Sequence, residues 1–430
     1  MSSLKPGLTH NANSFKILMV STEYPPMNGG VGRYTSNLTR ELNKLGLQVQ
    51  VLSNENGHGD FFGLSPKNTK NYSVLLKIVN EVKPDIVHIQ FEHGLYGLKL
   101  DSLNPKKSNT NIDLFYDLCK TPIVTTFHTA FNFKQWMNIV ATKNKDEKWK
   151  VKTYAEKLLK YWTHLINYKS FNNLNKDKIK KSKRGIVFSQ YMRDKIGGGD
   201  IIYHGSEPLI TYDATIKGKA RTKFSLSQKK RIILALGFRT NTKGWDILDK
   251  MVIPANWTIV MNSSKNYYNT ENYIPKISAI HEKEIIDLHK GFLNDSDLSL
   301  LFYAADAVIL PYKVSSGSGV MFDGLAHGLP FIAADLEFFK EFSAMGLGIT
   351  VKRNPKEFSK ALVALNNNYE YYAKNVILFK ENLKWDNIAR NHISLYKQII
   401  EENNVAPTIK QRNSNNFHSS VKLRKIDESN

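Results

Sequence analysis

The sequence predicts an α/β protein built from two doubly wound parallel-sheet domains. Short runs of Val, Ile, Leu and Phe alternate with helical patterns along most of the chain, which is typical of βαβ units. The alternation starts again near the middle of the chain, and 430 residues are enough for two hydrophobic cores. We therefore expect two domains of similar size.

The first half contains six candidate strands separated by helical segments. The strands show little alternation of polar and apolar residues, as expected for strands buried on both faces. Helices are predicted at Tyr34–Leu45 and Tyr72–Val82, where apolar residues recur at helical spacing. The candidate strands are Lys16–Ser21, Gln48–Leu52, Ile86–Gln90, Ile123–Phe127, Gly185–Ser189 and Ile201–His204.

The second half repeats this architecture without repeating the sequence. Helices are predicted at Ser296–Ala305 and Ser318–His327, and again from about Pro355 to Glu402 with a break near Trp385. The candidate strands are Arg231–Gly237, Thr258–Asn262, Ile285–His289, Ala307–Leu310, Phe331–Ala334 and Gly348–Val351.

These elements divide the chain into domains and flanking segments. Residues 403–430 are rich in Asn, Ser and Lys, which predicts a mostly disordered basic tail. The expected division is a flexible N-terminus at 1–14, a first domain at 15–215 with a basic helical insert at about 134–184, a second domain at 216–384, a helix at 385–402 that packs back on the first domain, and the tail at 403–430.

The composition excludes several classes of protein. One cysteine, Cys119, excludes an internal disulfide framework and a cysteine-rich zinc scaffold. No apolar run is long enough to span a bilayer, and residues 1–14 lack the apolar core of a signal peptide. We expect a soluble, cytoplasmic protein.

The charge of the chain is strongly positive, with 60 Lys and Arg against 39 Asp and Glu and a formal net charge of +21. This balance favours a partner rich in phosphate or carboxylate: nucleic acid, an anionic bilayer or an anionic substrate. Between Lys143 and Arg184 there are 14 Lys or Arg and 4 Asp or Glu, interleaved with aromatic and aliphatic residues. This stretch predicts either a helix at the face of an anionic membrane or an ordinary helix with a solvated lysine face. Nucleic acid is not expected, because no nucleic-acid-binding module is present.

A glycine-rich loop follows the first predicted strand and precedes a helix. Gly29, Gly30 and Gly32 permit backbone conformations closed to other residues and let a ligand approach the main chain. The helix N-terminus behind them is suited to phosphate or to sugar hydroxyls. A tight turn is the alternative interpretation.

Three histidines follow predicted strands: His93, His128 and His204. Ligands of open parallel sheets bind beyond the carboxyl ends of the strands, so His93 and His128 are expected beside the glycine loop. A structural role for each histidine is the alternative. A zinc site is not favoured, because no His-x-x-x-His or cysteine pairing accompanies them.

In the second half, two predicted strands end in loops with binding chemistry. Arg239 and Lys243 follow the strand Arg231–Gly237, where two cations could stabilise a diphosphate; a solvated loop is the alternative. A Ser/Gly loop follows the strand Ala307–Leu310, and its amides at the helix start suit an anionic group. The residues of this loop and helix that we assign to the site are Gly317, Ser318, Gly319, Val320 and Asp323, the last as a carboxylate for a ribose diol.

The Asp295-Ser-Asp297 segment has the D-x-D spacing with which many transferases hold a divalent metal. It directly precedes a predicted helix, where Asp or Ser is the expected N-cap. We therefore interpret it as a helix cap and expect no metal site.

Taken together, these residues resemble the retaining glycosyltransferases of family 4, which have the two-domain GT-B fold. The resemblance covers about residues 15–402. The loop Gly29-Gly-Val-Gly32 looks like the N-terminal glycine loop of that family, and His128 looks like its active-site histidine. Arg239 and Lys243 resemble its basic pair, although the usual spacing is one residue longer.

The segment that normally carries two glutamates departs from the family pattern. The flanking residues Asp306–Pro311 and Gly324–Pro330 match closely, but Ser315 stands at the first glutamate position and Asp323 at the second. Asp323 can still hold a ribose. The loss of the first carboxylate leaves open an altered donor or a weakened enzyme.

The resemblance implies a hexosyltransferase that moves a sugar, with retention of configuration, from a UDP-, GDP- or ADP-sugar to a glycan, lipid-linked glycan or small molecule. It implies His128, Arg239 and Lys243 as catalytic residues, the Ser/Gly loop with Ser315 as the donor site, and Gly29, Gly30 and Gly32 on the acceptor side. His93 is assigned to the acceptor side from its position after a predicted strand. The resemblance also implies no cofactor and no metal, and contact with an anionic membrane at the inner face is compatible with it.

Two alternatives remain. A nucleotide-sugar epimerase or hydrolase of the same fold would use the same donor cleft with a catalytic carboxylate such as Glu92. A non-catalytic sugar-binding homologue would follow from the loss at Ser315.

Overall fold

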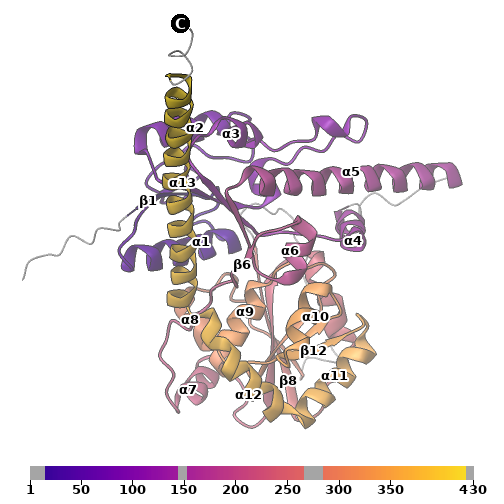
Figure 1. Ribbon diagram of the computed structural model, residues 1–430. Coiled ribbons are helices and arrows are strands. Elements are labelled where there is room, and N and C mark those ends of the chain that lie inside the picture. The colour runs from indigo at the N-terminus through magenta and orange to yellow at the C-terminus, as the bar shows by residue number, and fades with distance from the viewer. Residues whose placement is uncertain (1–14, 144–152, 266–283, 423–430) are drawn as a thin grey trace, which may run out of the picture.

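The computed structural model describes residues 15–143, 153–265 and 284–422, and it confirms the predicted fold class. Two six-stranded parallel sheets form the centres of two domains, which lie one above the other in Figure 1. The order β2-β1-β3-β4-β5-β6 in the first sheet and β12-β11-β10-β7-β8-β9 in the second is that of doubly wound domains.

The strands of the first sheet have nearly the predicted bounds. The exception is β6, which is two residues long, because the chain leaves the sheet early and continues as the linker to the second domain. The strands are β1 (Lys16–Val20), β2 (Gln48–Leu52), β3 (Ile86–Phe91), β4 (Ile123–Phe127), β5 (Arg184–Val187) and β6 (Asp200–Ile201).

The helices of the first domain include the predicted insert, which forms α4 and α5. The first-domain helices are α1 (Gly30–Lys44), α2 (Asn71–Val82), α3 (Asp113–Leu118), α4 (Phe133–Lys143), α5 (Tyr154–Lys181) and α6 (Gln190–Ile196), with short 3-10 turns η1 (His93–Tyr96) and η2 (Pro105–Lys107).

The second sheet is centred on β7, which pairs along its whole length with β8 and on its other side with β10. Its strands are β7 (Arg231–Phe238), β8 (Trp257–Ser264), β9 (Ile285–Asp287), β10 (Ala307–Leu310), β11 (Phe331–Ala334) and β12 (Gly348–Val351). The helices are α7 (Ile216–Lys223), α8 (Asp295–Ala304), α9 (Gly319–Ala326), α10 (Glu337–Ala344), α11 (Pro355–Asn367) and α12 (Tyr369–Phe379), with 3-10 turns η3 (Asn241–Lys243), η4 (Trp245–Lys250) and η6 (Lys380–Leu383).

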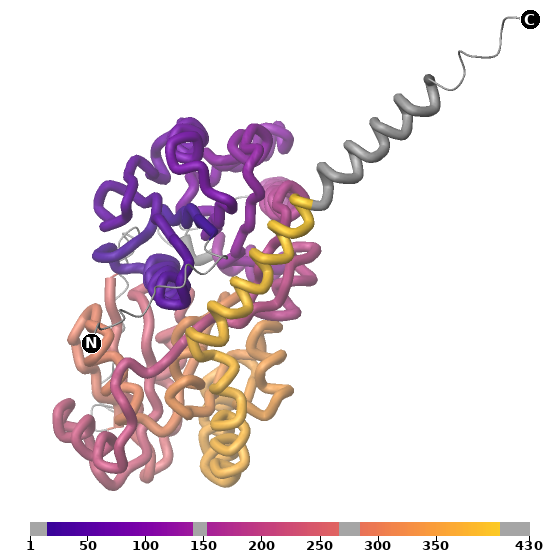
Figure 2. The backbone as a smooth tube through the Cα atoms, turned by 60° about the vertical axis from the view of Figure 1, so that its left-hand side comes forward, coloured from indigo at the N-terminus to yellow at the C-terminus, as the bar shows by residue number. Residues whose placement is uncertain are grey.

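The last helix, α13 (Trp385–Lys422), begins beside the second domain and runs along the first, where it contacts α1 (Figures 1 and 2). The hydroxyl of Tyr396 lies 2.6 Å from Nδ1 of His88, and both side chains are fully buried. The helix continues beyond residue 402, where we expected a disordered tail, so residues 403–422 are helical. Elongation of an existing helix costs less than nucleation, and it can therefore pass the point where apolar periodicity stops.

Buried contacts hold the two domains together. One continuous cluster of buried apolar side chains includes Leu18 of the first sheet, Leu234 of the second sheet and Trp385 of α13. The carboxylate of Glu341 on α10 also accepts hydrogen bonds from the backbone N–H groups of Gln190 and Tyr191, at 2.9 and 3.0 Å, and so caps α6 of the other domain. Among the described residues, no helix is both long and apolar enough to cross a bilayer.

We expect the substitution Gly205→Ala to destabilise the protein. Gly205 lies in the linker, where an added Cβ would be 2.5 Å from the buried ring of Trp385. Overpacking of this kind costs about 1–3 kcal/mol, measurable as a loss in the free energy of unfolding in urea. Gly218→Ala is the matched control, because its Cβ would have no neighbour closer than 3.8 Å. Equal stability of the two variants would contradict the packing argument.

Candidate functional site

The carboxyl ends of both sheets face a cleft between the domains, and two adjoining cavities of about 290 and 220 Å³ open there. Each sheet turns its topological switch point to this cleft: the loops after β1 and β3 in the first domain, and those after β7 and β10 in the second. Ligands of doubly wound domains bind at such points. The two cavities share a wall formed by Gly30, Arg33, Gly317, Ser318, Gly319 and Asp323.

The larger cavity lies mainly against the second domain. Lys243 lines it, with its ammonium 3.9 Å from the ring centroid of Tyr312, a contact that holds the cation at the end of β7. The backbone at Gly237 has φ +154, and the alkyl chain of Lys243 lies against it. The cavity therefore offers a positioned cation at the switch point of the second sheet.

The Ser/Gly loop forms the wall between the cavities and opens α9. The hydroxyl of Ser318 accepts a hydrogen bond from the N–H of Met321 at 3.2 Å and caps the helix. Gly317, Ser318 and Gly319 line both cavities, and Val320 lines the larger one. The positive end of the α9 dipole therefore faces the cleft, as the sequence predicted.

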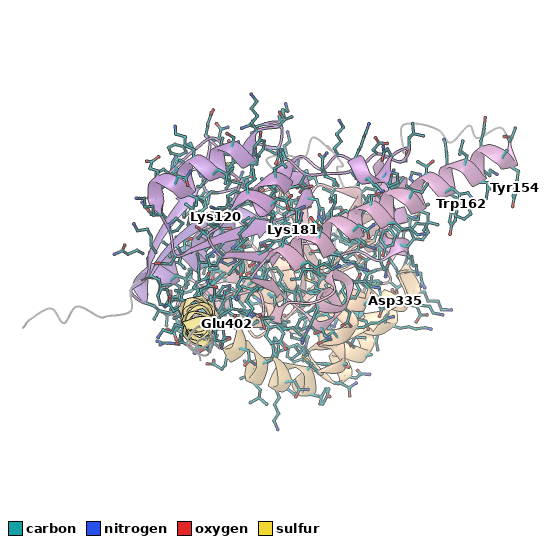
Figure 3. All side chains as sticks on the ribbon, turned by 45° about the horizontal axis from the view of Figure 1, so that its top comes forward. Lys120, Tyr154, Trp162, Lys181, Asp335 and Glu402 are labelled. Carbon is teal, nitrogen blue, oxygen red and sulfur yellow. The ribbon has the colours of Figure 1, made fainter. Side chains whose placement is uncertain are left out.

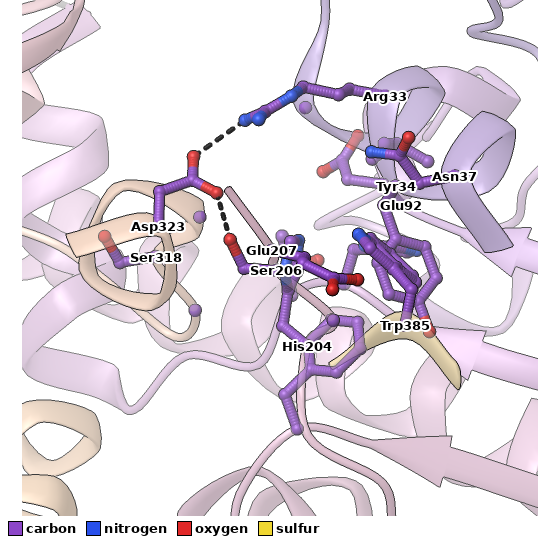
Figure 4. Close-up of a pocket in the computed structure, with 18 residues that line it drawn as sticks. Arg33, Tyr34, Asn37, Glu92, His204, Ser206, Glu207, Ser318, Asp323 and Trp385 are labelled. Atoms are coloured by element: carbon purple, nitrogen blue, oxygen red, sulfur yellow. Dashed lines mark hydrogen bonds and ion pairs between the residues drawn. The ribbon is translucent and has the colours of Figure 1, made fainter. Parts of the chain in front are cut away.

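Asp323 on α9 makes an ion pair with Arg33 across the cleft (Figure 4). Its Oδ2 accepts a hydrogen bond from Nη1 of Arg33 at 2.7 Å, and its Oδ1 accepts one from the hydroxyl of Ser206 in the linker. Arg33 also pairs with Asp295 on α8, with Nε 3.3 Å from Oδ1. First domain, second domain and linker thus meet at one carboxylate.

The environment of Asp323 keeps it ionised although it is buried. Burial alone would raise the pKa of this carboxyl, but the Arg33 guanidinium and the Ser206 hydroxyl outweigh burial and hold the pKa below its usual value. The neighbouring His204 is neutral near pH 7, because burial lowers its pKa to about 4.

The glycine loop wraps around a buried carboxylate, Glu23. Its Oε2 accepts hydrogen bonds from the N–H groups of Val31 and Gly32, at 3.0 and 3.1 Å. A Cβ at Gly29 would lie 1.7 Å from the carboxylate, so a side chain there would displace Glu23 from its present position. These two amides are therefore already occupied, and the loop is not the open phosphate cradle that its glycines suggested.

Gly32 lies against the backbone of Glu23 and lines neither of the two cavities, whereas Gly29 lines the larger one. Burial raises the pKa of Glu23 to about 7; the amides of Gly32 and Val31 oppose this rise, and the charge of Glu92 adds to it. Glu23 thus titrates in the physiological range beneath the glycine loop.

The smaller cavity lies mainly against the first domain and is rich in aromatic rings. His128, at the end of β4, packs edge-on against Tyr34 and Phe188, with ring centroids 5.3 and 5.2 Å away. Its Nε2 is 3.0 Å from Oε1 of Gln90, an oxygen that only accepts, so Nε2 carries the proton and Nδ1 is the acceptor. Burial, followed by the nearby His204, lowers the pKa of His128 to about 3, so the imidazole is neutral.

Four of the predicted site residues lie outside both cavities: Gly32, described above, and His93, Arg239 and Ser315. His93 is buried in the first domain, stacked on Phe171 at 4.0 Å, and the adjacent Glu92 lines the smaller cavity instead. Arg239 lies beside β8, with Nε 3.3 Å from the hydroxyl of Ser263. The Ser315 hydroxyl donates a hydrogen bond to the carbonyl of Gly317 at 3.0 Å, which stabilises the conformation of the Ser/Gly loop.

Side-chain direction explains why these predicted residues lie outside the cavities. The sequence places a residue at a strand end but does not say whether its side chain turns toward the cleft or into the domain. The His93 side chain turns into the domain and packs on apolar neighbours, and burial lowers its pKa well below the ordinary value.

Several cleft residues were missed by the sequence analysis. Arg33, directly after the glycine loop, had a usable signal, because it is a cation at the start of a helix, where the dipole disfavours it. Glu23, Ser206 and Trp385 had none, because their roles depend on contacts with segments far away in the chain.

The D-x-D segment is part of a helix start. The N-cap of α8 is Asn294, which accepts a hydrogen bond from the N–H of Asp297 at 2.8 Å, so the cap lies one residue earlier than expected. Asp295 and Asp297 pair with Arg33 and Lys223. Within 15–143, 153–265 and 284–422, no group of three or more His, Cys, Asp or Glu side chains is placed to hold a metal ion.

Known proteins share this architecture. Residues 28–198 match the family described as Glycosyltransferase Family 4. An uncharacterized glycosyltransferase of Methanocaldococcus jannaschii is 22% identical over 422 residues, which cover 90% of this chain and 99% of the relative.

Solved structures agree over nearly the full length. Sucrose-phosphate synthase from Thermosynechococcus elongatus superposes with a TM-score of 0.64 at 13% identity, covering 90% of this chain and all of that one. Anabaena HepE in complex with UDP-glucose has a TM-score of 0.56 at 14% identity, covering 91% of this chain and all of that one. The fold is therefore GT-B, and the resemblance to family 4 is confirmed for residues 28–198.

We expect the Arg33–Asp323 pair to couple the two domains measurably. In a double-mutant cycle with Arg33→Met and Asp323→Asn, the coupling energy in urea unfolding should be about 1–3 kcal/mol, because Asp323 is buried. Arg33 is 31% exposed, which keeps the value below that of a fully buried pair. The exposed pair Lys340–Glu337 is the control and should give less than about 0.5 kcal/mol. Equal coupling in both cycles would refute the assignment.

We also expect Glu23 to make stability depend on pH. Its folded-state pKa is raised from 4.5 to about 7, so the folded protein holds the proton more tightly and stability falls as pH rises through this window. Relative to the variant Glu23→Gln, the parent should lose about 3 kcal/mol or somewhat less of unfolding free energy across it. Urea titrations at several pH values measure this. An exposed control, Glu55→Gln, should leave the parent profile unchanged; a Glu23→Gln profile parallel to the parent would disprove the shift.

Proposed function

We propose that this chain, a glycosyltransferase of the GT4 type with the GT-B fold, transfers a sugar from a nucleotide-sugar donor to an acceptor with retention of anomeric configuration. The second domain would hold the donor and the first domain the acceptor. One observation carries the proposal: Lys243, the N-terminus of α9 and Asp323 converge on the larger cavity, opposite the glycine loop. HepE of Anabaena, which shares this fold, was solved with UDP-glucose.

The donor diphosphate would lie between Lys243 and the amides of the Ser/Gly loop. A cation and a helix N-terminus both stabilise the negative charge of phosphate oxygens. Asp323 would accept hydrogen bonds from the ribose hydroxyls. Each of its oxygens has one hydrogen-bond donor in the structure, and a carboxylate can accept about four hydrogen bonds, so one position on each oxygen remains.

The chemical step would proceed by departure of the nucleotide diphosphate as positive charge develops on the sugar. Lys243 and the α9 dipole are already in place when negative charge grows on the leaving phosphate, so they lower the barrier without reorganisation. We propose that the acceptor hydroxyl attacks from the face on which the phosphate departs and passes its proton to that phosphate. This route needs no protein nucleophile, and Lys243 with the helix N-terminus takes the role of a metal ion.

The acceptor would occupy the smaller cavity. Its aromatic wall suits the apolar faces of sugar rings, and the neutral His128 offers an Nδ1 acceptor to a hydroxyl. Glu92 provides a carboxylate on the same wall. The position of Glu92 also keeps an epimerase or hydrolase as the second candidate, because such an enzyme needs a carboxylate near the sugar. Donor turnover that does not require an added acceptor would favour this second candidate.

A thermal-shift screen with UDP-, GDP- and ADP-sugars tests the donor site. A ligand that binds only the folded state stabilises it by about 2.7 kcal/mol at 100 times its dissociation constant. We expect one nucleotide to raise the melting temperature and the matching sugar series to identify the donor. No shift with any nucleotide-sugar would count against the proposal.

We expect Lys243→Met to lower kcat/KM for sugar transfer about 100-fold, because one preorganised group that stabilises transition-state charge is lost. The loss should appear mainly in kcat. Lys250→Met is the matched control, since Lys250 is exposed on η4 and lines neither cavity. Comparable rates for the two variants would remove Lys243 from the site.

A further inference from the structure

We propose that the outer half of α5 is a docking surface for an anionic lipid bilayer. Large apolar side chains are exposed there in sequence: Tyr154 is 82% exposed, Leu159 69% and Trp162 52%, with Leu158 and Tyr161 close to half exposed. Figure 3 shows Tyr154 and Trp162 on the part of the helix that projects beyond the body of the protein. Exposed apolar residues in such a group mark interaction sites.

The exposed residues share one side of the helix. At 100° per residue, the positions of Tyr154, Leu158, Tyr161 and Trp162 fall within an arc of about 100°, and Leu159 extends its edge. Lys157 lies about 40° beyond Tyr161, at the edge of the apolar arc, and Lys160 lies about 100° beyond it, on the polar side of the helix. The outer half of α5 is therefore amphipathic, with aromatic residues in its apolar arc and lysines at its edge and on its polar side.

The inner half of the same helix shows what a covered face looks like. There Phe171 and Leu174 are buried in the first domain, and Tyr168 packs on Phe133 of α4 with ring centroids 5.3 Å apart. The contacts end near Tyr161, whose ring meets Phe133 edge-on at 5.6 Å. At 100° per residue, Phe171 and Leu174 lie on the other side of α5 from Leu158 and Trp162, which remain about half exposed. The apolar arc of the outer half is therefore turned away from the face by which the inner half packs on the first domain.

Charge selects a bilayer over a second copy of the chain. The protein carries a net charge of +21, so two copies repel each other, whereas an anionic membrane attracts both the whole molecule and the lysines of the outer half of α5. Tryptophan and tyrosine favour the interface between headgroups and acyl chains, and an amphipathic helix lies in that plane. The combination of aromatic residues, leucines and lysines fits this partner.

The docking surface lies one helix away from the cleft. α4 follows the loop that carries His128 and touches the second domain, where the side-chain amide of Asn138 donates to the carbonyl of Lys313 at 3.1 Å. A bilayer bound by α5 would therefore lie beside the domain boundary. This position suits an acceptor carried on a lipid, a step that rests on the proposed function.

Vesicle co-sedimentation of the full chain tests the docking surface, with no nucleotide-sugar present, so that its outcome does not depend on transfer. The parent protein should sediment with phosphatidylglycerol-containing vesicles and not with pure phosphatidylcholine vesicles, and salt should weaken binding. The double variant Leu159→Ser, Trp162→Ser should bind these anionic vesicles at least about tenfold more weakly than the parent. Lys157→Gln and Lys160→Gln should each cost roughly fivefold.

A matched control uses exposed residues of the same kind on α12 of the second domain. Tyr371 and Leu378 are 59% and 68% exposed, and the double variant Tyr371→Ser, Leu378→Ser should bind vesicles as the parent does. Circular dichroism and melting temperature should be unchanged in both double variants, because all four side chains are exposed.

Three outcomes would overturn the proposal: no sedimentation of the parent with anionic vesicles, equal loss in the α5 and α12 variants, or unchanged binding of the α5 variant. A dimer in sedimentation velocity that disappears with Leu159→Ser, Trp162→Ser, without vesicle binding by the parent, would instead assign the surface to a second copy. Transfer activity without vesicle binding would leave the proposed function intact and remove the docking surface.

Discussion

The ion pair between Arg33 and Asp323 is the contact on which the geometry of the cleft depends. It joins the first turn of α1 to α9, and the Ser206 hydroxyl ties the linker to the same carboxylate. Because Asp323 is buried, its charge must be compensated from within the protein, and the compensating cation comes from the other domain. The same ion pair therefore joins the two domains and keeps the candidate ribose-binding group ionised. Under the proposed function, a donor that engages Asp323 would share it with Arg33, so donor binding would act on a contact between the domains.

The two glycine-rich segments solve different problems. In the first domain, the loop folds around the Glu23 carboxylate, and the absence of a side chain at Gly29 makes room for it. In the second domain, Gly317 and Gly319 stand at the cleft itself and open the helix whose dipole faces the cavity. Similar glycine-rich sequences thus have different roles. In the first domain the loop amides are bonded to Glu23, and in the second domain the loop forms a wall of the cavity. The asymmetry agrees with the second domain holding the charged substrate.

The sequence was sufficient for the fold and for part of the site. Buried parallel strands form unbroken apolar runs, so Ala307–Leu310 could be located to the residue, and the Ser/Gly loop was expected at the cleft because strand ends meet at one edge. Side-chain direction could not be predicted in this way, which is why His93 and Arg239 turned out to lie outside both cavities. The pairing of Arg33 with Asp323 spans 290 positions of the chain, and nothing local in either segment encodes it. The exposure of Trp162 likewise depends on where the body of the protein ends, which periodicity does not reveal.

The course of α13 has a consequence for how the protein is made. Trp385, its first residue, lines the smaller cavity, and the helix then packs on α1 of the first domain. A ribosome releases the chain from its N-terminus, so this part of the first domain arrives only after the entire second domain has been synthesised. Until then α1 and His88 lack their partner, and one wall of the cavity is missing. A polypeptide that stops before α13 therefore lacks one wall of the smaller cavity, which is the acceptor site under the proposed function.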